Sequence, residues 1–336
     1  MVEKKVRVLI VDDSVLMREA LRAILSSDPG LEVVGMARDG REGVEKALAL
    51  KPDVITMDLR MPIMSGLETI EAIMEESPIS IIVVSTMDVS VIVKALGIGA
   101  MDFVAVAQDI DAIAKDLIEK VKIASRVKPL RRMKMRPSPS GAIVSRKTGK
   151  EAKVVALGIS TGGPQALNEL FARLPAHFPA GILVVQHISV GFINGLAEWL
   201  KGNSPLQMQV AKAGDTIKPG SVLFAPDNYN MTVNESGEIV LREDVTKHLL
   251  HVPSIDLMMQ SVAQAYGKDS IGVLMTGMGK DGFEGIKQIK AAGGTTIAQD
   301  EATSVVFGMN KMVIDAGFID KVLPLHEIAA ELERLV

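Results

Sequence analysis

Short apolar runs alternate with amphipathic helical patterns along nearly the whole chain, and this rhythm limits the possible folds more than any other feature of the sequence. Before residue 125, five runs of strand length lie at 6–11, 32–37, 54–57, 81–85 and 102–106. Helical patterns follow them, beginning near Ser14, Arg41, Gly66, Val89 and Asp109. Strands that alternate with helices in this way predict a parallel, doubly wound sheet.

The same rhythm returns after residue 152. Strand-like runs lie at 154–159, 182–186, 222–225, 271–276 and 295–298, and long helical patterns follow several of them. Residues 229–241 predict a small β-hairpin with its turn at 234–237. With 336 residues, the chain is long enough for two domains. We therefore predict an α/β fold made of two doubly wound parallel-sheet domains.

A basic stretch separates the two predicted domains. Residues 126–153 contain ten basic residues and one acid, Glu151, together with Pro129, Pro137 and Pro139. Such a segment buries little apolar surface, so it is typical of a linker. We predict a first domain at 1–124, a linker at 125–152 and a second domain at 153–336. The linker is either simply solvated or a basic tether that contacts an acidic partner, and the sequence leaves both open.

The composition excludes several classes of protein. The chain has no cysteine, which excludes disulfides, thiolate metal sites and a cysteine nucleophile. Its net charge of -4 argues against nucleic-acid binding. The apolar run at 6–11 includes Arg7 and is too short for a signal peptide or a membrane span. We expect a cytoplasmic protein that binds no nucleic acid and inserts into no membrane.

Carboxylates follow two predicted strands of the first domain. Asp12 and Asp13 come after the first strand, Asp58 after the third, and the hydroxyl of Thr86 after the fourth. Because parallel strands deliver their carboxyl ends to one edge, these groups should meet there. Mg²⁺ would relieve the repulsion among three carboxylates, and one of them would then accept a phosphoryl group. The alternative is that these acids only cap the following helices, which suits Asp13 better than Asp58.

The motifs around these residues resemble the receiver domain of bacterial response regulators. They are VLIVDDS, VITMDLRMPIMSG, VVSTM and GAMDF, and the resemblance covers roughly residues 5–124. It implies a flavodoxin-like fold, phosphorylation of Asp58 by a histidine kinase, and a magnesium site at Asp12, Asp13 and Asp58. The backbone carbonyl of Arg60 would be a further magnesium ligand.

The resemblance also implies a switch. Thr86 and Phe103 fall at the receiver's hydroxyl and aromatic switch positions. One position departs from the pattern, because receivers usually carry Lys-Pro after the fifth strand and this chain has Val106 and Ala107. The missing ammonium group would contact the phosphoryl group, so the coupling of phosphorylation to output is expected to be weakened.

A glycine-rich turn opens the second domain. Residues 158–164 read GISTGGP, and Gly158-x-Ser160-x-Gly162 fits the nucleophile elbow that exposes a serine between a strand and a helix. The helix N-terminus would favour the negative charge that develops on a reacting substrate. The same loop would also suit a phosphate cradle or a plain turn.

The residues expected to lie beside Ser160 distinguish these three interpretations of the turn. His187 follows a strand directly and should lie at the same sheet edge as Ser160. Asp281 is the only carboxylate in the loop MTGMGKDG after another strand, so it is the candidate to orient His187, although it also suits a helix N-cap. The other four histidines have weaker placements: His177 lies in a proline-flanked loop, His248 and His251 follow a charged stretch, and His326 begins the last helix.

The motifs GISTGGP, VVQH and MTGMGKDG closely resemble the catalytic domain of the chemotaxis protein-glutamate methylesterases. QDEATSVVFGM and FAPDNYNM add to a resemblance that covers nearly all of residues 153–336. It implies a Rossmann-like esterase domain that hydrolyses glutamate methyl esters on the cytoplasmic helices of chemoreceptors, releases methanol and deamidates certain glutamines. The catalytic triad would be Ser160, His187 and Asp281, and the esterase reaction would need no cofactor. Backbone N–H groups near Thr161 and Met278 would hold the oxyanion.

Two other classes of output domain fit the sequence less well. A nucleotide-binding module would use the glycine-rich loop, but the Lys-Ser/Thr continuation of a phosphate-binding loop is missing. No acid stands at the usual place after the predicted second strand, where the residues are Gln186 and His187. A DNA-binding output would need a small helical domain with a basic face, whereas this half of the chain predicts a long α/β pattern.

Overall fold

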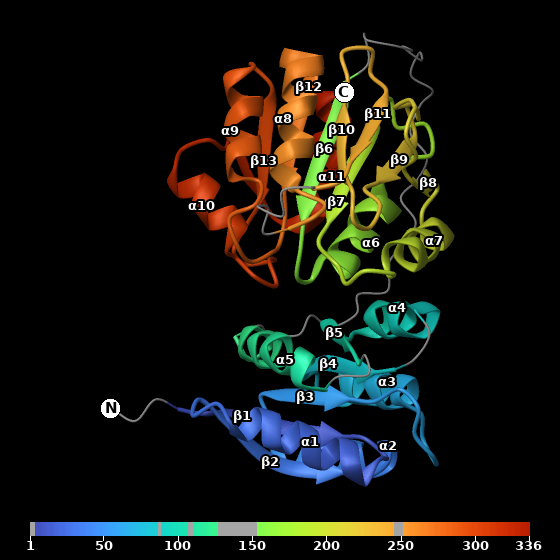
Figure 1. The fold of residues 1–336 in the computed structure, drawn as a ribbon, viewed down its shortest axis with the longest axis vertical. Helices are drawn as coiled ribbons and strands as arrows, with labels where there is room; N and C mark the ends of the chain where they lie inside the picture. The colour runs from blue at the N-terminus through green and yellow to red at the C-terminus, as the bar shows by residue number, and fades with distance from the viewer. Residues whose placement is uncertain (1–3, 87–88, 107–109, 127–152, 245–250) are drawn as a thin grey trace. The chain divides into compact units, whose positions relative to one another are not determined.

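The computed structural model describes residues 4–86, 89–106, 110–126, 153–244 and 251–336. The chain divides into two compact units, Met1–Met135 and Arg136–Val336. Each unit contains one main sheet, as Figure 1 shows. Most of the predicted linker lies outside the described residues, so the domain limits at 124 and 153 stay predictions.

The first unit is a five-stranded parallel sheet in the order β2-β1-β3-β4-β5. This is the flavodoxin-like order, and it confirms the predicted fold. The strands are β1 (Val6–Val11), β2 (Leu31–Ala37), β3 (Val54–Met57), β4 (Ser80–Ser85) and β5 (Asp102–Ala105). The helices are α1 (Val15–Ser26), α2 (Gly40–Leu50), α3 (Gly66–Glu76), α4 (Val89–Ile98) and α5 (Ile110–Ala124).

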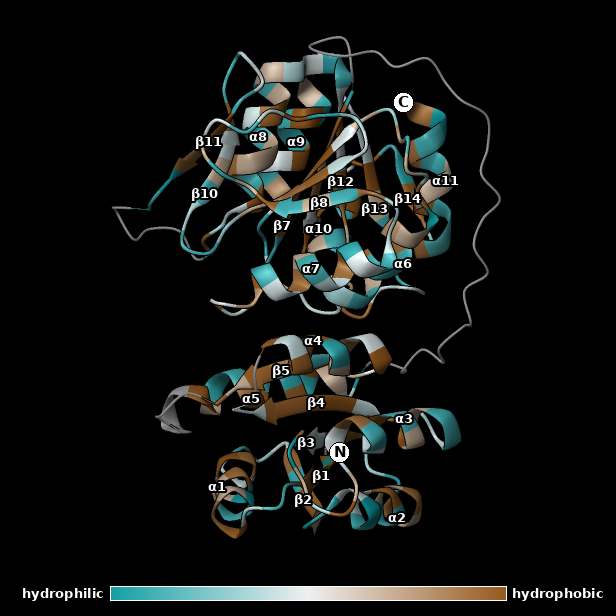
Figure 2. Cartoon of the chain, turned by 90° about the vertical axis from the view of Figure 1, so that its right-hand side faces the viewer, coloured by the Kyte–Doolittle hydropathy of each residue, from teal (hydrophilic) through white to brown (hydrophobic). Residues whose placement is uncertain are grey.

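Buried apolar runs account for the strands of the first sheet. All residues of β3 and β4 are buried, which is why they read as continuous apolar runs. Figure 2 shows strands in the hydrophobic colour, β4 most clearly. Helix α1 contacts α5, while α3 contacts both α2 and α4. Helices thus cover both faces of the sheet. The edge formed by the carboxyl ends of its strands is left available for a functional site.

The second unit is a seven-stranded parallel sheet in the order β14-β13-β12-β6-β7-β9-β8. Its strands are β6 (Val154–Ile159), β7 (Gly181–Gln186), β8 (Gln207–Val210), β9 (Ser221–Phe224), β12 (Ser270–Leu274), β13 (Thr295–Gln299) and β14 (Lys321–Leu323). The predicted hairpin is confirmed by β10 (Asn230–Val233) and β11 (Ile239–Arg242), which pair antiparallel. The two edge strands, β8 and β14, were not predicted from the sequence.

Two hydrophobic cores lie on opposite faces of this sheet. One face packs against α6 (Gly163–Arg173), α7 (Ile193–Asn203) and α11 (Leu325–Leu335). The other packs against α8 (Ile255–Tyr266), α9 (Phe283–Ala291), α10 (Met309–Asp315) and the hairpin, and a short 3₁₀ turn (Gly267–Asp269) follows α8. Among the described residues, no helix is both long and apolar enough to cross a membrane.

Candidate active site and phosphorylation site

The predicted triad residues follow three neighbouring strands of the second sheet. Strand β6 pairs with β7 on one side and with β12 on the other. Ser160 comes directly after β6, His187 directly after β7, and Asp281 lies in the loop between β12 and α9. The chain leaves β6 toward β7, and the later strands β12 and β13 extend the sheet the other way. The three residues therefore lie around a topological switch point, where open α/β sheets bind ligands.

His187 and Asp281 form a direct pair. His187 Nε2 lies 2.9 Å from Asp281 Oδ2, and the two side chains are only about a tenth exposed. The other ring nitrogen, Nδ1, is buried and has no hydrogen-bond partner among the described residues. The backbone N–H of His187 donates to Ile159 O (3.0 Å), which ties the base to the residue before Ser160. No hydrogen bond joins Ser160 Oγ to His187 in the described part of the chain, and such bonds are often long without substrate.

The N-terminus of α8 holds the Asp281 carboxylate. Oδ2 accepts the N–H of Ile255 (2.8 Å), and Oδ1 accepts the N–H of Asp256 (2.9 Å) and the hydroxyl of Ser254 (3.1 Å). Burial favours the protonated acid, but the bonds from His187 and from this helix end outweigh burial and hold the pKa of Asp281 below its usual value. Asp281 is therefore an ionised acceptor beside His187. The sequence also predicted Asp281 as a helix N-cap, and Asp281 does cap a helix, although this helix is α8 and not the following α9.

Close packing explains two glycines of the GISTGGP turn. A Cβ on Gly158 would lie 2.3 Å from Ile255 Cγ2, and one on Gly162 would lie 2.5 Å from Val305 Cβ. Gly162 also has a φ of 79°, in the left-handed region that glycine adopts at little cost. Ser160 does not have a positive φ. The left-handed residue of this turn is therefore the glycine two positions beyond the serine.

Two backbone N–H groups near Ser160 donate to no acceptor within the described residues. They belong to Thr161 and Met278, whereas the N–H of Gly277 donates to Val306 O (2.9 Å). The side chain of Met278 is 44% exposed. These are the two positions that the sequence analysis named.

A second histidine, which the sequence analysis did not select, stacks on His187. The ring centroids of His187 and His251 lie 4.4 Å apart, and the ring planes are inclined by 22°. Burial and the neighbouring His187 lower the pKa of His251, which keeps a second positive charge away from the base. His326 is exposed, and His248 lies outside the described residues.

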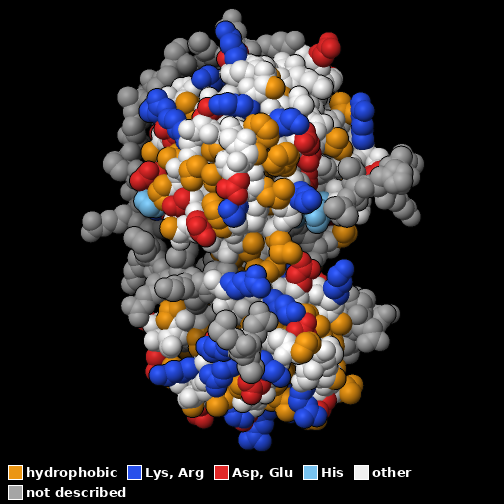
Figure 3. Space-filling view, turned by 90° about the vertical axis from the view of Figure 1, so that its left-hand side faces the viewer, with side chains coloured by type: hydrophobic (Ala, Val, Ile, Leu, Met, Phe, Trp, Pro, Cys, Tyr) orange, Lys and Arg blue, Asp and Glu red, His pale blue; other side chains and the backbone are white. Residues whose placement is uncertain are grey.

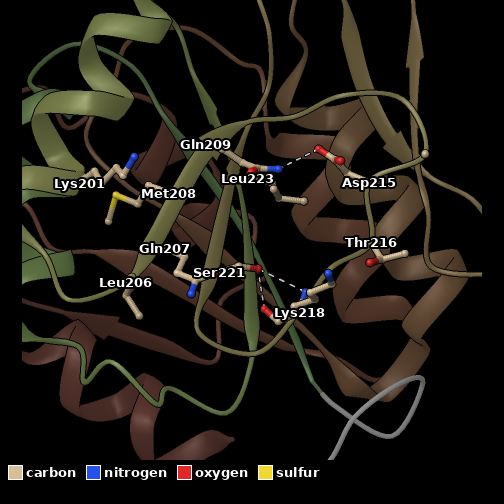
Figure 4. Close-up of a pocket in the computed structure, with 11 residues that line it drawn as sticks. Lys201, Leu206, Gln207, Met208, Gln209, Asp215, Thr216, Lys218, Ser221 and Leu223 are labelled. Carbon is tan, nitrogen blue, oxygen red and sulfur yellow. Dashed lines mark hydrogen bonds between the residues drawn. The ribbon is translucent and has the colours of Figure 1, made fainter.

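The triad does not line the hollow drawn in Figure 4. That hollow, of about 600 Å³, lies beside β8 and β9 and is lined by residues such as Lys201, Gln209 and Lys218. Its polar groups already pair with one another, because Gln209 Nε2 donates to Asp215 (3.0 Å) and Ser221 Oγ donates to Lys218 O (2.6 Å). We place the chemistry at the strand ends instead.

The carboxylates of the first unit meet at the edge of its sheet, as predicted. Asp12 and Asp13 follow β1, and Asp58 follows β3, the neighbour of β1. Burial, with added repulsion from Asp58 and Asp13, raises the pKa of Asp12 to about 6, and burial also raises that of Asp58. These carboxylates would gain from a divalent cation. Among the described residues, no group of three His, Asp or Glu side chains is arranged to hold a metal ion. Mg²⁺ usually binds only one or two carboxylates, however, and keeps several water ligands.

The hydroxyl that reaches Asp58 belongs to Ser85, whereas Thr86 was predicted to occupy the receiver's hydroxyl position. Ser85 Oγ donates to Asp58 Oδ1 at 2.7 Å, and Ser85 is buried at the end of β4. Thr86, one residue further, is exposed. Successive side chains of a strand point in opposite directions, so a shift of one residue turns the hydroxyl away from the site.

We therefore expect Ser85→Ala to weaken the response to phosphorylation about tenfold, because a hydrogen bond to a charged group contributes ~1.5–3 kcal/mol. Thr86→Ala, the matched control, should respond like the natural chain. The measurement is esterase activity with and without a small phosphoryl donor. A larger loss in Thr86→Ala than in Ser85→Ala would restore the original assignment.

Phe103 lies within β5, and Val106 directly follows this strand. Phe103 is buried, and Lys120 Nζ lies 5.3 Å from the centre of its ring. The N–H of Val106 donates to Ser85 O (3.1 Å), which places Val106 beside the hydroxyl residue. No lysine forms an ion pair with Asp58 among the described residues, and Lys94 is exposed on α4.

A receiver-like site in one unit and a serine–histidine–aspartate arrangement in the other define a response regulator with a hydrolase-type output. The family comparisons agree with both halves. Residues 8–118 match the family model of the response regulator receiver domain, and residues 155–332 match that of the CheB methylesterase. The chain belongs to the CheB methylesterase family.

Similar proteins share the whole length of the chain. It is 40% identical to the protein-glutamate methylesterase/protein-glutamine glutaminase of Thermotoga maritima, over all of both chains. It is also 40% identical to a Geobacter metallireducens protein of the same name, covering 99% of this chain and 98% of the relative. The crystal structure of the CheB methylesterase catalytic domain from Thermotoga maritima covers 55% of this chain and 99% of its own, with 40% identity and a TM-score of 0.53. The predicted family and fold are thereby confirmed.

Proposed function

We propose that the chain is a phosphorylation-regulated serine esterase that hydrolyses glutamate methyl esters on chemoreceptors and deamidates receptor glutamines during chemotactic adaptation. The pair formed by His187 and Asp281 beside Ser160 is the observation that carries this proposal. The family and the names of the relatives support the substrate and both reactions. Receptor helices would be the substrate in the cytoplasm, and a chemotaxis histidine kinase would supply the phosphoryl group.

We propose a role for each nitrogen of His187. Asp281 engages Nε2, which leaves Nδ1 to take the proton of Ser160 as its hydroxyl attacks the ester carbonyl. Ionised Asp281 stabilises the imidazolium that forms. The N–H groups of Thr161 and Met278 would stabilise the oxyanion. His187 then protonates the departing methoxide, or the amide nitrogen of a glutamine so that it leaves as ammonia, and activates the water that releases the acyl group.

Asp58 is proposed as the phosphoacceptor of the receiver. Asp12, Asp13, Asp58 and the carbonyl of Arg60 would hold Mg²⁺, which supplies charge neutralisation for the incoming phosphoryl group when bound. The chain itself contributes the hydroxyl of Ser85, which faces the acceptor carboxylate. The proposed mechanism of the esterase reaction has no step that requires a cofactor.

A serine-directed fluorophosphonate separates this proposal from the two rival classes. The esterase should be labelled at Ser160, with the site located by peptide mass spectrometry. A nucleotide-binding or DNA-binding output would show no such labelling. The seven-stranded sheet already argues against a small helical DNA-binding domain. On the face of the second unit drawn in Figure 3, basic and acidic side chains are interspersed, which does not favour DNA binding either.

Deletion of residues 1–150 is expected to raise the basal activity. The receiver is expected to restrain the esterase until it is phosphorylated, so removal of this inhibitory part of the chain should raise the activity. The catalytic domain of the Thermotoga maritima relative has been crystallised separately, which makes this truncation practicable. The measurement is methanol release per enzyme at saturating substrate. A well-folded truncated protein that is no more active than the full chain would show that the receiver does not inhibit the esterase.

A further inference from the structure

A buried glutamine lies between the main chains of the proposed nucleophile and base. Gln186 is the last residue of β7 and only 3% exposed. Its Nε2 donates to Ser160 O (2.9 Å) and to His187 O (2.8 Å). Two carbonyl acceptors on one nitrogen fix the orientation of the amide, because a flipped oxygen would be repelled by both. One side chain thus joins the turn that carries the serine to the turn that carries the histidine.

The glycine-rich turn is shaped around this amide. A Cβ on Gly163 would lie only 1.9 Å from Gln186 Oε1 and 2.7 Å from Nε2. Gly163 begins α6 and has no positive φ, so its backbone does not require glycine. The third glycine of the GISTGGP motif, Gly163, is therefore explained by the space that Gln186 occupies.

We infer that Gln186 is a positioning residue, which fixes the backbone of Ser160 relative to that of His187 and so sets the distance between nucleophile and base. This inference rests on the proposed function. A β-strand alone leaves the residues after its end free to turn, and near-attack geometry tolerates little displacement: a shift of about 1 Å costs on the order of a hundredfold in rate. The amide restrains both turns where the backbone ladder of β6 and β7 ends.

Gly163→Ala tests this role without removing the amide. The new methyl group must push the flexible end of Gln186 away from the two carbonyls, while alanine suits the first turn of a helix. We expect kcat to fall roughly tenfold to a hundredfold with little change in KM. In a Gln186→Ala background, where the space is empty, Gly163→Ala should cost no further rate. If Gly163→Ala keeps at least half of kcat, or costs the same in both backgrounds, the inference fails.

Gln186→Glu allows a measurement of activity against pH. The activity of this variant relative to the natural chain would not depend on pH if Gln186 only stabilised the fold. A carboxylate cannot donate to the two carbonyls, whereas a protonated acid can donate to one. The activity of this variant relative to the natural chain should therefore rise as the pH falls. A ratio that stays constant with pH, at near-natural activity, would contradict the inference.

Asn310→Leu is the matched control. Asn310 is also buried, its Nδ2 donates to Gln299 O (3.0 Å) and Ser304 Oγ (3.1 Å), and its Oδ1 has no partner among the described residues, as is true of Gln186 Oε1. The Asn310→Leu variant should lower the midpoint of thermal unfolding about as much as Gln186→Ala does, yet it should retain most of kcat. Equal losses of kcat in the two variants would overturn the inference. The rate of Ser160 labelling by a fluorophosphonate is measured in parallel. It reports on the position of the nucleophile even if the natural chain releases no methanol, an outcome that would refute the proposed substrate instead.

Discussion

Replacing Ser160 or His187 by alanine is expected to lower the turnover of methyl-ester hydrolysis on the order of a millionfold, because a nucleophile and its base act as one unit. The Ser160→Ala variant should fold normally, since the hydroxyl makes no hydrogen bond within the described residues. The measurement is single-turnover methanol release, with circular dichroism to verify the fold. A folded Ser160→Ala protein that retains methylesterase activity would contradict the assignment of the nucleophile.

Asp281→Asn should cost less, about ten-thousandfold, because serine and base both survive. The asparagine cannot reproduce the contacts of the carboxylate. Oδ1 and Oδ2 together accept bonds from Ser254, Ile255 and Asp256 as well as from His187. Replacing one oxygen by NH₂ therefore sets a donor against another donor. A loss of stability should accompany the loss of rate, which distinguishes this variant from Ser160→Ala.

The fold was predictable wherever the sheet is buried on both faces. Strand β6 was predicted with its observed limits, and β7 within one residue, because central parallel strands form uninterrupted apolar runs. The edge strands lack that signal. Strand β8 alternates exposed and buried residues over only four positions, and β14 has three residues, none of them buried.

The sequence predicts which strands the candidate site residues follow, but it does not predict the individual contacts that they make. Ser160, His187 and Asp281 follow strands that the topology brings together. Two contacts depend on details that periodicity does not encode. The choice between Ser85 and Thr86 turns on a one-residue register, and the stacking of His251 on His187 depends on the path of the chain ahead of α8. Pro253 and Ser254 before an apolar helical pattern do signal that helix start, but not the carboxylate that it would hold.

Val106→Lys is expected to increase the activation by phosphorylation by one to two decades. In receivers that carry lysine at this position, the ammonium gains a phosphoryl partner on activation, and such a charge-assisted hydrogen bond contributes ~1.5–3 kcal/mol. A two-state equilibrium shifts only by the differential interaction free energy, so this contact alone changes the activated fraction about tenfold to a hundredfold. Val106 lies beside Ser85, where the ammonium would reach Asp58.

The comparison is made between the natural chain and Val106→Lys, each with and without a small phosphoryl donor. Phosphorylation of Asp58 itself should be detected in both, since Asp12, Asp13 and Asp58 are all in place. Lys94→Ala in the natural chain is the matched control, and it should change nothing because Lys94 is exposed. If the natural chain is already strongly activated and the lysine adds nothing, the coupling never depended on position 106.

Methanol release from a methylated chemoreceptor fragment, measured for the full chain with and without a phosphoryl donor, tests the central claim most directly. We predict methanol in step with the appearance of unmethylated glutamates, an increase on addition of the donor, and no release by Ser160→Ala. Absence of methanol from the folded natural chain in both conditions, or equal release by Ser160→Ala, would contradict the account of a receiver-controlled serine esterase.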